Sequence, residues 1–448
     1  MAFVGSAAAQ SAPAPIPSPR PATAVKPIAA KPAVAKPAPR GLAKVSNSAL
    51  PSYDSGSYQR IQAAMLSYSA LQVRGGWPSL PANLRLEAGS TGPEVALLRQ
   101  RLAVSEDLAA DHSDGETYDA NLVAAVRLFQ ARHGLEETGT IGPKTVAALN
   151  VPVQRRIRQL AASLDRLTEL NFSFGQRYVV VNIPAAVAEA VNNDKVEHRY
   201  VVVVGKFDRP SPTLTTSITA INLNPTWTVP LSILKKDIVT KMRKDPNYVS
   251  RMRMRVLDAN GAELDPKTVD WKSDRAPNFT VRQDSGLGNA LGVLRIDMPN
   301  PHSVFMHDTN HKEHFSIDYR FHSSGCTRVA EVRDLAVWLL ADNPGWGRRE
   351  LDAAIASSAR QDLRLTRKVP VAWIYMTGWV TRDDVVHFRD DVYKHDDDNR
   401  RPLIAHVTRP PIVTAARASG FVLQSAEPQT TNTIQSPAIE QVSFLDSR

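Results

Sequence analysis

Residues 305–329 read FMHDTNHKEHFSIDYRFHSSGCTRV and contain the only cysteine of the chain. Within this segment His307 precedes Cys326 by 19 residues. The apolar residues after Cys326 recur at the i, i+3, i+4 and i+7 positions of an amphipathic helix, namely Val329, Val332, Leu335, Ala336, Leu339 and Leu340. The spacing therefore predicts that Cys326 lies near a helix N-terminus.

This pattern favours a catalytic role for Cys326 over the inert, buried role that is usual for a lone cysteine. The free N–H groups and positive dipole at a helix N-terminus stabilise a thiolate, and Arg328 adds a positive charge. Gly325 has no Cβ, so it lets substrate approach and leaves backbone N–H groups free to face an oxyanion. With His307 as candidate base, the segment has what nucleophilic catalysis requires.

Length and composition bound the kind of protein. A chain of 448 residues suggests two or three folded units plus tails. The single cysteine excludes intramolecular disulfides and a thiolate metal cluster supplied by this chain alone. The formal charge of +9 suits an anionic polymer, and the chain carries no nucleic-acid-binding signature. No run of about 20 apolar residues is present, so an integral membrane protein is not expected.

The first 50 residues indicate export and a flexible tether. Ala7, Ala8 and Ala9 form the small-x-small pattern of a signal-peptidase site, with Gln10 as the mature start. The pattern is either the tail of a signal peptide whose true start lies upstream or a chance match, and export is the favoured alternative. The Pro- and Ala-rich stretch that follows cannot bury enough apolar surface to order itself. We therefore expect residues 1–50 to be a signal-peptide remnant and a disordered tether, in a protein of the periplasm.

Helical patterns occupy the next part of the chain. Residues 51–83 hold a short amphipathic helix that ends at a Gly-Gly-Trp-Pro turn. Residues 84–153 show three helical patterns separated by glycines, with a Phe-Gln pair and a Gly-Leu-x-x-Thr-Gly turn. This segment resembles the small three-helix peptidoglycan-binding domain of many wall enzymes, although a helical scaffold without a ligand stays an alternative. Residues 154–176 are predicted to be a helical connector.

Short β-branched runs bounded by Pro and Gly begin near Tyr178, and they predict a mostly β domain over residues 177–380. A helical and irregular insertion, residues 231–282, carries 12 Lys or Arg against 7 Asp or Glu. Residues 381–448 are expected to be a C-terminal extension that is largely disordered after about residue 405. The fold class is thus multidomain α+β.

The motifs together resemble the L,D-transpeptidases. The pattern His-Asp-Thr followed by Ser-Ser-Gly-Cys-x-Arg-Val is similar to their catalytic signature, in a variant with Ser324 rather than His before Gly-Cys. The segments NPTWTVP at 224–230 and GLGNALG at 286–292 resemble motifs of the large, capped Gram-negative members, which also carry a peptidoglycan-binding domain. The resemblance implies a β-sandwich-like catalytic domain with an inserted capping subdomain at 231–282.

The resemblance also implies a reaction and roles for the residues. Cys326 would attack the diaminopimelate carbonyl of a tetrapeptide stem, release D-alanine and form a thioester, and family members are acylated at this thiol by carbapenems. His307 would act as general base and acid with a pKa near neutrality, transferring the acyl group to a second stem as a 3-3 cross-link. The implied site residues are Gly325 at the oxyanion hole and Ser323, Ser324 and Arg328 for orientation. Substrate-binding candidates are Phe305, which shares a strand face with His307, Asn224, and Trp227, for which core packing or a hinge role stays an alternative.

Several alternatives stay open at this point. An L,D-carboxypeptidase would use water as acceptor, and another transpeptidase would attach an outer-membrane protein or lipoprotein to the wall. A non-catalytic wall-binding scaffold is a third alternative, against which the intact pair His307 and Cys326 argues. The group that orients His307 is not predicted, because Ser324 replaces the usual histidine. The other histidines of this region, His302, His311, His314 and His322, match no zinc spacing, and no metal or cofactor is expected.

Overall fold

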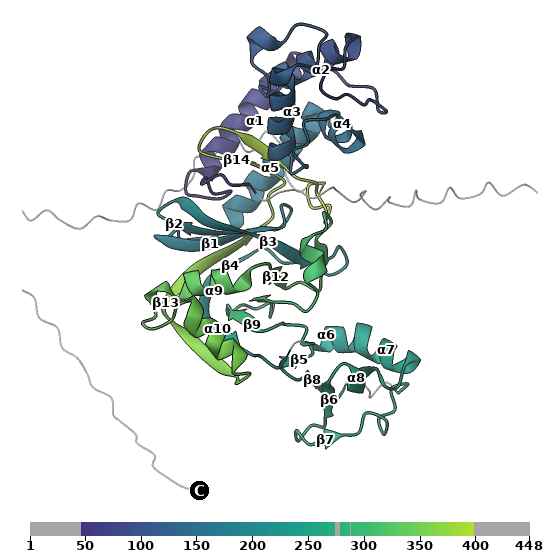
Figure 1. Cartoon of the computed structure of the whole chain (residues 1–448), viewed down its shortest axis with the longest axis vertical. Coiled ribbons are helices and arrows are strands. Elements are labelled where there is room, and N and C mark those ends of the chain that lie inside the picture. The colour runs from purple at the N-terminus through teal and green to yellow at the C-terminus, as the bar shows by residue number, and fades with distance from the viewer. Residues whose placement is uncertain (1–45, 274–277, 287, 398–448) are drawn as a thin grey trace, which may run out of the picture. The chain divides into compact units, whose positions relative to one another are not determined.

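The computed structural model describes residues 46–273, 278–286 and 288–397. The predicted signal-peptide remnant, most of the predicted tether and the C-terminal tail after residue 405 lie outside these ranges. None of the helices in the described ranges combines the length and the apolar character needed to cross a bilayer. Figure 1 shows the order of the elements along the chain.

The N-terminal part is helical, as predicted. Its elements are α1 (Ser57–Val73), α2 (Pro93–Val104), η1 (Ala110–His112), α3 (Ala120–Arg132), α4 (Pro143–Leu149) and α5 (Val153–Glu169). Proline at the first position starts α2 and α4, and the Asp119 side chain caps α3 by accepting from the Leu122 N–H. Helices α2, α3 and α4 enclose their own apolar core, which includes Leu98 and Phe129. Helix α1 packs against α5, the predicted connector.

A nine-stranded sheet forms the second part. Its order is β11-β3-β12-β10-β9-β4-β13-β1-β2, and an additional pairing of β2 with β3 closes it into a ring. The strands are β1 (Arg177–Asn182), β2 (Val187–Asn192), β3 (Lys195–Gly205), β4 (Leu214–Leu223), β9 (Leu294–Asp297), β10 (Met306–His307), β11 (Phe321–Ser323), β12 (Thr327–Val329) and β13 (Gln361–Ile374). Strand β3 makes this closure possible because its first half pairs with β2 and its second half with β12 and β11.

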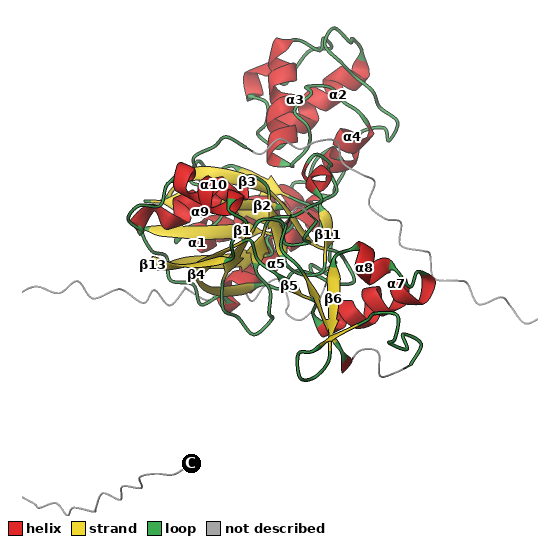
Figure 2. Ribbon diagram, turned by 60° about the horizontal axis from the view of Figure 1, so that its bottom comes forward, coloured by secondary structure: helices red, strands yellow, loops and turns green. Residues whose placement is uncertain are grey.

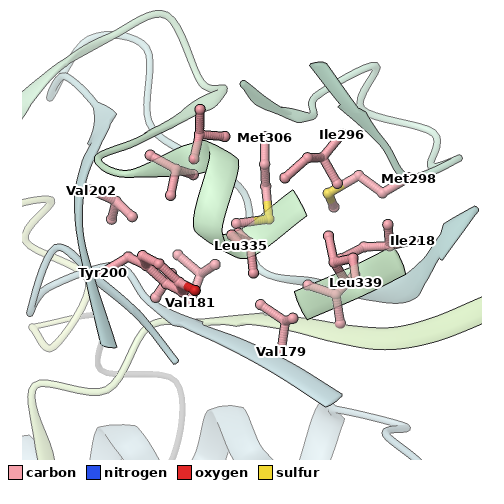
Figure 3. Close-up of a cluster of buried hydrophobic side chains, with 14 of the residues drawn as sticks. Val179, Val181, Tyr200, Val202, Ile218, Ile296, Met298, Met306, Leu335 and Leu339 are labelled. Carbon is pink, nitrogen blue, oxygen red and sulfur yellow. The ribbon is translucent and has the colours of Figure 1, made fainter. Parts of the chain in front are cut away.

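Successive side chains of β1 point alternately into two separate apolar cores. Val179 and Val181 point into the main core, which helices α9 (Val332–Leu339) and α10 (Arg348–Ala356) and the turn η5 (Leu340–Asp342) complete. Figure 3 shows Leu335 and Leu339 of α9 facing these strand residues. Tyr178 and Val180 point to the second core, on α1 and α5. Both faces of β1 are buried, and for this reason its sequence is a nearly continuous apolar run.

The inserted segment is a separate layer with its own core, and we call residues 227–283 the capping subdomain. Its helices are α6 (Leu231–Ile233), the π-helical turn η2 (Leu234–Ile238), α7 (Val239–Lys244) and α8 (Tyr248–Arg251). They pack on a four-stranded sheet, β5-β8-β6-β7, made by β5 (Trp227–Thr228), β6 (Met254–Leu257), β7 (Glu263–Leu264) and β8 (Thr280–Gln283). Figure 2 shows these elements grouped together. The prediction of a helical and irregular insertion missed this sheet, because its strands of two to four residues are too short for a visible alternation.

The last described elements return to the N-terminal helices. Strands β14 (Gly378–Val380) and β15 (Val386–Phe388) form a hairpin, and Phe388 is buried in the second core.

A 3₁₀ turn, η4 (Lys312–Phe315), lies in the segment between β10 and β11. The structure thus confirms a helical N-terminal region followed by a mostly β domain.

Candidate active site

Cys326 lies in a three-residue bend between β11 and β12, which we call the Cys326 loop (residues 324–326). Strand β12 follows immediately, and helix α9 begins only at Val332, after Glu331 in a left-handed conformation. Cys326 was predicted to lie near a helix N-terminus, and the structure places it six residues before α9, with β12 between them. Val329 belongs to a buried strand, not to the helix. It precedes Val332 by three residues, which is also the spacing of neighbouring residues on one face of a helix. The dipole of α9 consequently does not act at the thiol.

Strand register brings His307 to the side of the cysteine. Strand β10 runs parallel to β12, with Met306 opposite Thr327 and His307 opposite Arg328. Since alternate residues share a face, Cys326, Arg328 and His307 lie on one face of the sheet. Met306 points to the opposite face and into the main core (Figure 3). His307 is therefore the cross-strand neighbour of Arg328, which follows Cys326 by two residues.

The ring of His307 is oriented by the residue that follows it. Its Nδ1 atom forms a hydrogen bond with the backbone carbonyl of Asp308. A carbonyl only accepts, so Nδ1 carries the proton and Nε2 keeps its lone pair. The Asp308 carboxylate in turn accepts from the Val293 N–H at 3.0 Å and forms an ion pair with Lys312. This arrangement supplies the orienting group that the sequence did not reveal.

Burial controls the protonation of both groups. Burial raises the pKa of Cys326 to about 11, although a hydrogen bond with the Phe305 backbone and the charge of Arg328 act in the opposite direction. Burial, followed by repulsion from Arg328, lowers the pKa of His307 to about 3. Burial therefore favours the uncharged form of both groups, and the predictions of a stabilised thiolate and of a near-neutral imidazole gain no support from these surroundings.

Hydrogen bonds inside the Cys326 loop fix the backbone around the thiol. The Ser323 hydroxyl donates to the Cys326 carbonyl at 2.5 Å and accepts from the Gly325 N–H at 3.2 Å. Gly325 has a φ of +116°, which an L residue rarely adopts, so glycine is required here. The Gly325 N–H is thus occupied. The N–H groups of Ser324 and Cys326 have no acceptor within the described ranges, so the Cys326 N–H is a free donor beside the thiol.

A second layer of contacts supports the loop from residues distant in the sequence. The Ser211 hydroxyl donates to the Gly325 carbonyl at 2.7 Å, and it also accepts from the Gly205 N–H. The buried Tyr393 hydroxyl donates to the Gly205 carbonyl and accepts from the Ser211 N–H at 3.3 Å. The end of β3 and the C-terminal segment therefore hold the Cys326 loop together.

Arg328 is a half-buried cation that lacks a carboxylate partner among the described residues. Its Nη1 atom is 3.1 Å from Nδ1 of His314, and its buried Nε makes no hydrogen bond within the described ranges. The ring of His314 stacks on that of His322, with centroids 4.8 Å apart. An arginine beside the thiol with spare donors is suited to bind an anionic group.

Ser324 faces the capping subdomain rather than His307. Its hydroxyl accepts from Nη1 of Arg209 at 3.1 Å. The same guanidinium forms a two-point ion pair with Asp237 of η2, in which the Nη2 to Oδ1 distance is 2.9 Å. The residue that replaces the usual histidine of the signature thus joins the Cys326 loop to the capping subdomain.

The three residues predicted to bind substrate lie in different surroundings. The ring of Phe305 makes an edge contact with His307, with centroids 5.6 Å apart, so it is part of the site. Trp227 packs against the core of the capping subdomain. The Asn224 amide donates to carbonyls at the C-terminal end of α10, among them Ile355 at 3.1 Å. The contacts of Trp227 and Asn224 are structural, and their predicted role in substrate binding gains no support from them.

Several residues of the site were not singled out by the sequence. Arg295 lies opposite His307 in the register of β9 and stands 5.1 Å from the centre of the Phe305 ring. Asp308 acts mainly through its backbone carbonyl, which no side-chain pattern can reveal. Ser211 and Tyr393 are separated from Cys326 by long stretches of chain, and only the tertiary fold brings them together.

Two parts of the chain match models of known protein families. Residues 176–355 match the family model described as L,D-transpeptidase catalytic domain. Residues 91–149 match the model described as "Putative peptidoglycan binding domain". The site around Cys326 therefore lies within the residues that match the L,D-transpeptidase model, and these residues follow the ones that match the peptidoglycan-binding model.

Individual relatives carry the same description. A protein of Haemophilus influenzae named "Putative L,D-transpeptidase" is 30% identical over 241 residues, which cover 53% of this chain and 48% of that protein. The chain thus spans about half the length of this curated relative. A solved L,D-transpeptidase from Stackebrandtia nassauensis is 14% identical with a TM-score of 0.26 and covers 66% of this chain and 96% of that one. One from Mycobacterium smegmatis is 15% identical with a TM-score of 0.23, covering 44% and 58%.

Proposed function

We propose that this protein is a periplasmic L,D-transpeptidase that forms 3-3 cross-links in peptidoglycan through a thioester on Cys326. The observation that carries the proposal is the strand register that sets His307 opposite Arg328, two residues after Cys326, with Nε2 of His307 left to accept a proton. Such a pair within an L,D-transpeptidase catalytic domain is what nucleophilic acyl transfer requires.

In the acylation step, the carbonyl carbon of the third residue of a tetrapeptide stem is attacked by Sγ of Cys326. Because the resting thiol is uncharged, His307 Nε2 takes its proton as the S–C bond forms. The Cys326 N–H donates to the developing oxyanion. The C–N bond then breaks, and the proton on His307 passes to the departing amine of D-alanine, leaving a thioester.

The acceptor amine of a second stem resolves the thioester. His307 Nε2 accepts a proton as this amine attacks, and the C–S bond breaks as the new amide forms. The proton then returns to the sulfur of Cys326. Asp308 keeps Nδ1 of His307 protonated through both steps, because its carbonyl can only accept a hydrogen bond.

Arg328 is proposed to bind a carboxylate of the donor stem. Its guanidinium lies on the same face as Cys326 and lacks a carboxylate partner among the described residues. Burial lowers the pKa of Arg328, because a cation that is held away from water without a counter-ion is destabilised. A bound carboxylate would remove that destabilisation.

The peptidoglycan-binding domain is proposed to hold the enzyme on the wall polymer, and the signal-peptide remnant expected at Ala7–Ala9 would place the protein outside the cytoplasm. The acceptor is assigned to a stem peptide. Water, which would give a carboxypeptidase, and the amine of an outer-membrane protein or lipoprotein are the competing acceptors.

Incubation of the purified protein with tetrapeptide-containing muropeptides, followed by mass analysis, tests the proposal. Dimers joined between two third-position residues are the expected product. Tripeptide monomers alone would indicate a carboxypeptidase, and unchanged donor would contradict an enzyme. The Cys326→Ala variant should lose both turnover and covalent acylation by a carbapenem, and a labelled adduct on that variant would contradict Cys326 as the nucleophile.

A further inference from the structure

The hydrogen bond between Arg328 and His314 constrains the charge of the histidine. A guanidinium has only donors, so Nδ1 of His314 must accept from Nη1 of Arg328 across their 3.1 Å separation. An imidazolium has no free lone pair and would also repel the arginine. The contact therefore exists only while His314 is neutral with its proton on Nε2.

The surroundings of His314 favour this neutral form. It lies on η4, between the rings of His311 at 5.5 Å and His322 at 4.8 Å, measured between centroids. Burial, followed by the charges of Arg328 and His322, lowers the pKa of His314. Glu313 acts in the opposite direction, but its carboxylate is exposed and contacts Nδ1 of His311 at 2.9 Å. These are the charged and titratable groups that act on His314.

Resting on the proposed function, we infer that His314 is a positioning residue that holds the guanidinium of Arg328 toward a carboxylate of the donor stem peptide. His314 occupies one Nη1 donor, and the remaining Nη N–H groups are left for the substrate. Loss of the imidazole lone pair frees the arginine side chain to adopt other rotamers. Donor binding then weakens, while the bond-making groups Cys326 and His307 stay in place.

Two substitutions of His314 separate the hydrogen bond from the bulk of the ring. His314→Ala removes the acceptor, and we expect the KM for a disaccharide tetrapeptide to rise about tenfold with kcat changed less than about twofold, as for loss of a ground-state contact. His314→Asn places a non-titrating oxygen near the former Nδ1 and should restore most of the loss. His311→Asn is the matched control, because His311 stacks on the same ring without contacting Arg328.

A double-mutant cycle tests whether His314 acts through Arg328. In an Arg328→Ala background, His314→Ala should have no further effect on KM. Donors amidated at one carboxylate at a time should include one for which the wild type and His314→Ala have equal KM. If His314→Ala lowers activity equally in both backgrounds and with every donor, the residue is merely structural and the inference is wrong.

The pH profile gives an independent readout. Protonation of His314 on the acid side should raise the donor KM of the wild type but not that of His314→Asn. If the donor KM rises equally at low pH in the wild type and in His314→Asn, the inference is wrong. The proposed function fails separately, namely if the wild type at pH 7.5 gives no product from the tetrapeptide donor. A wild type that is active and a His314→Ala variant with unchanged KM would refute only the role of His314.

Discussion

Nδ1 of His307 is bonded to the backbone carbonyl of Asp308, so a contact between consecutive residues sets which ring nitrogen can act as the base. The carbonyl is held in place because the N–H of Asp308 donates to Leu294 in β9 at 2.9 Å. No side chain is needed to select the tautomer. A substitution that keeps the backbone of residue 308 should therefore preserve the orientation of the base.

Replacing His307 should remove the proton transfers and leave the fold. We expect His307→Asn to lower kcat/KM by about 10²- to 10⁴-fold, the usual contribution of a general acid–base group. Steady-state turnover of a tetrapeptide donor measures this, and circular dichroism checks the fold. The exposed His302, replaced by Asn, serves as the control. Turnover within twofold of wild type would contradict the role of His307.

The free thiol should react slowly at neutral pH. Because burial raises the pKa of Cys326 to about 11, the thiolate that attacks iodoacetamide and displaces iodide forms mainly above about pH 9. The rate of alkylation should rise continuously from pH 7 to pH 11, and the single cysteine makes the mass readout unambiguous. The urea-unfolded protein, with an ordinary thiol, should titrate near pH 8.5. A rate that is already maximal at pH 7 would reveal a thiolate–imidazolium pair instead.

Stability should fall in acid because buried histidines must become charged. Burial lowers the pKa of His307 and of His387 to about 3 each, whereas the unfolded value is about 6.5. Between pH 6.5 and 3 the unfolded chain binds more protons, so stability is full above pH 6.5 and is lost as the pH falls toward 3. Thermal melts should show a shallower acid decline for His387→Gln than for wild type. The exposed His112→Gln should leave the decline unchanged.

Gly292 should be required for the position of Asp308. A Cβ at residue 292 would stand 2.3 Å from the Asp308 carboxylate, and the φ of +61° is unfavourable for alanine. We expect Gly292→Ala to displace Asp308 and His307 and to lower kcat by about 10²-fold, the effect of a misplacement of about 1 Å. Gly288→Ala is the control from the same motif, since its Cβ would meet nothing within 4 Å. Equal activity of the two variants would show that this contact is not needed.

Local patterns predicted the parts of this molecule that depend on neighbouring residues. The helices α1 and α5 follow their apolar periodicity, and the β-branched run around Val179 became a strand of the main core. The sequence also indicated that His307 and Cys326 belong to one site, and this stays a prediction because only the pairing of His307 with Arg328 is seen in the strand register. Here the sequence pattern and the local structure carry the same information.

Long-range contacts and burial account for what was missed. The closure of the sheet through β3 depends on pairings that no local pattern encodes. The effect of burial on Cys326 was missed because nearby charges are visible in a sequence, whereas desolvation depends on the tertiary fold. The roles of Asp308 and Gly205 rest on backbone atoms, which are the same in every residue type.

The support of the Cys326 loop by Tyr393 has a consequence for the order of synthesis. Ribosomes make chains from the N-terminus, so Cys326 emerges well before the tyrosine whose hydroxyl holds Gly205 and Ser211 beneath the loop. A nascent chain therefore carries its thiol in a loop that lacks its last buried support. We expect the reactive cysteine to reach its final setting only as a late step of maturation, when almost the whole described chain has folded.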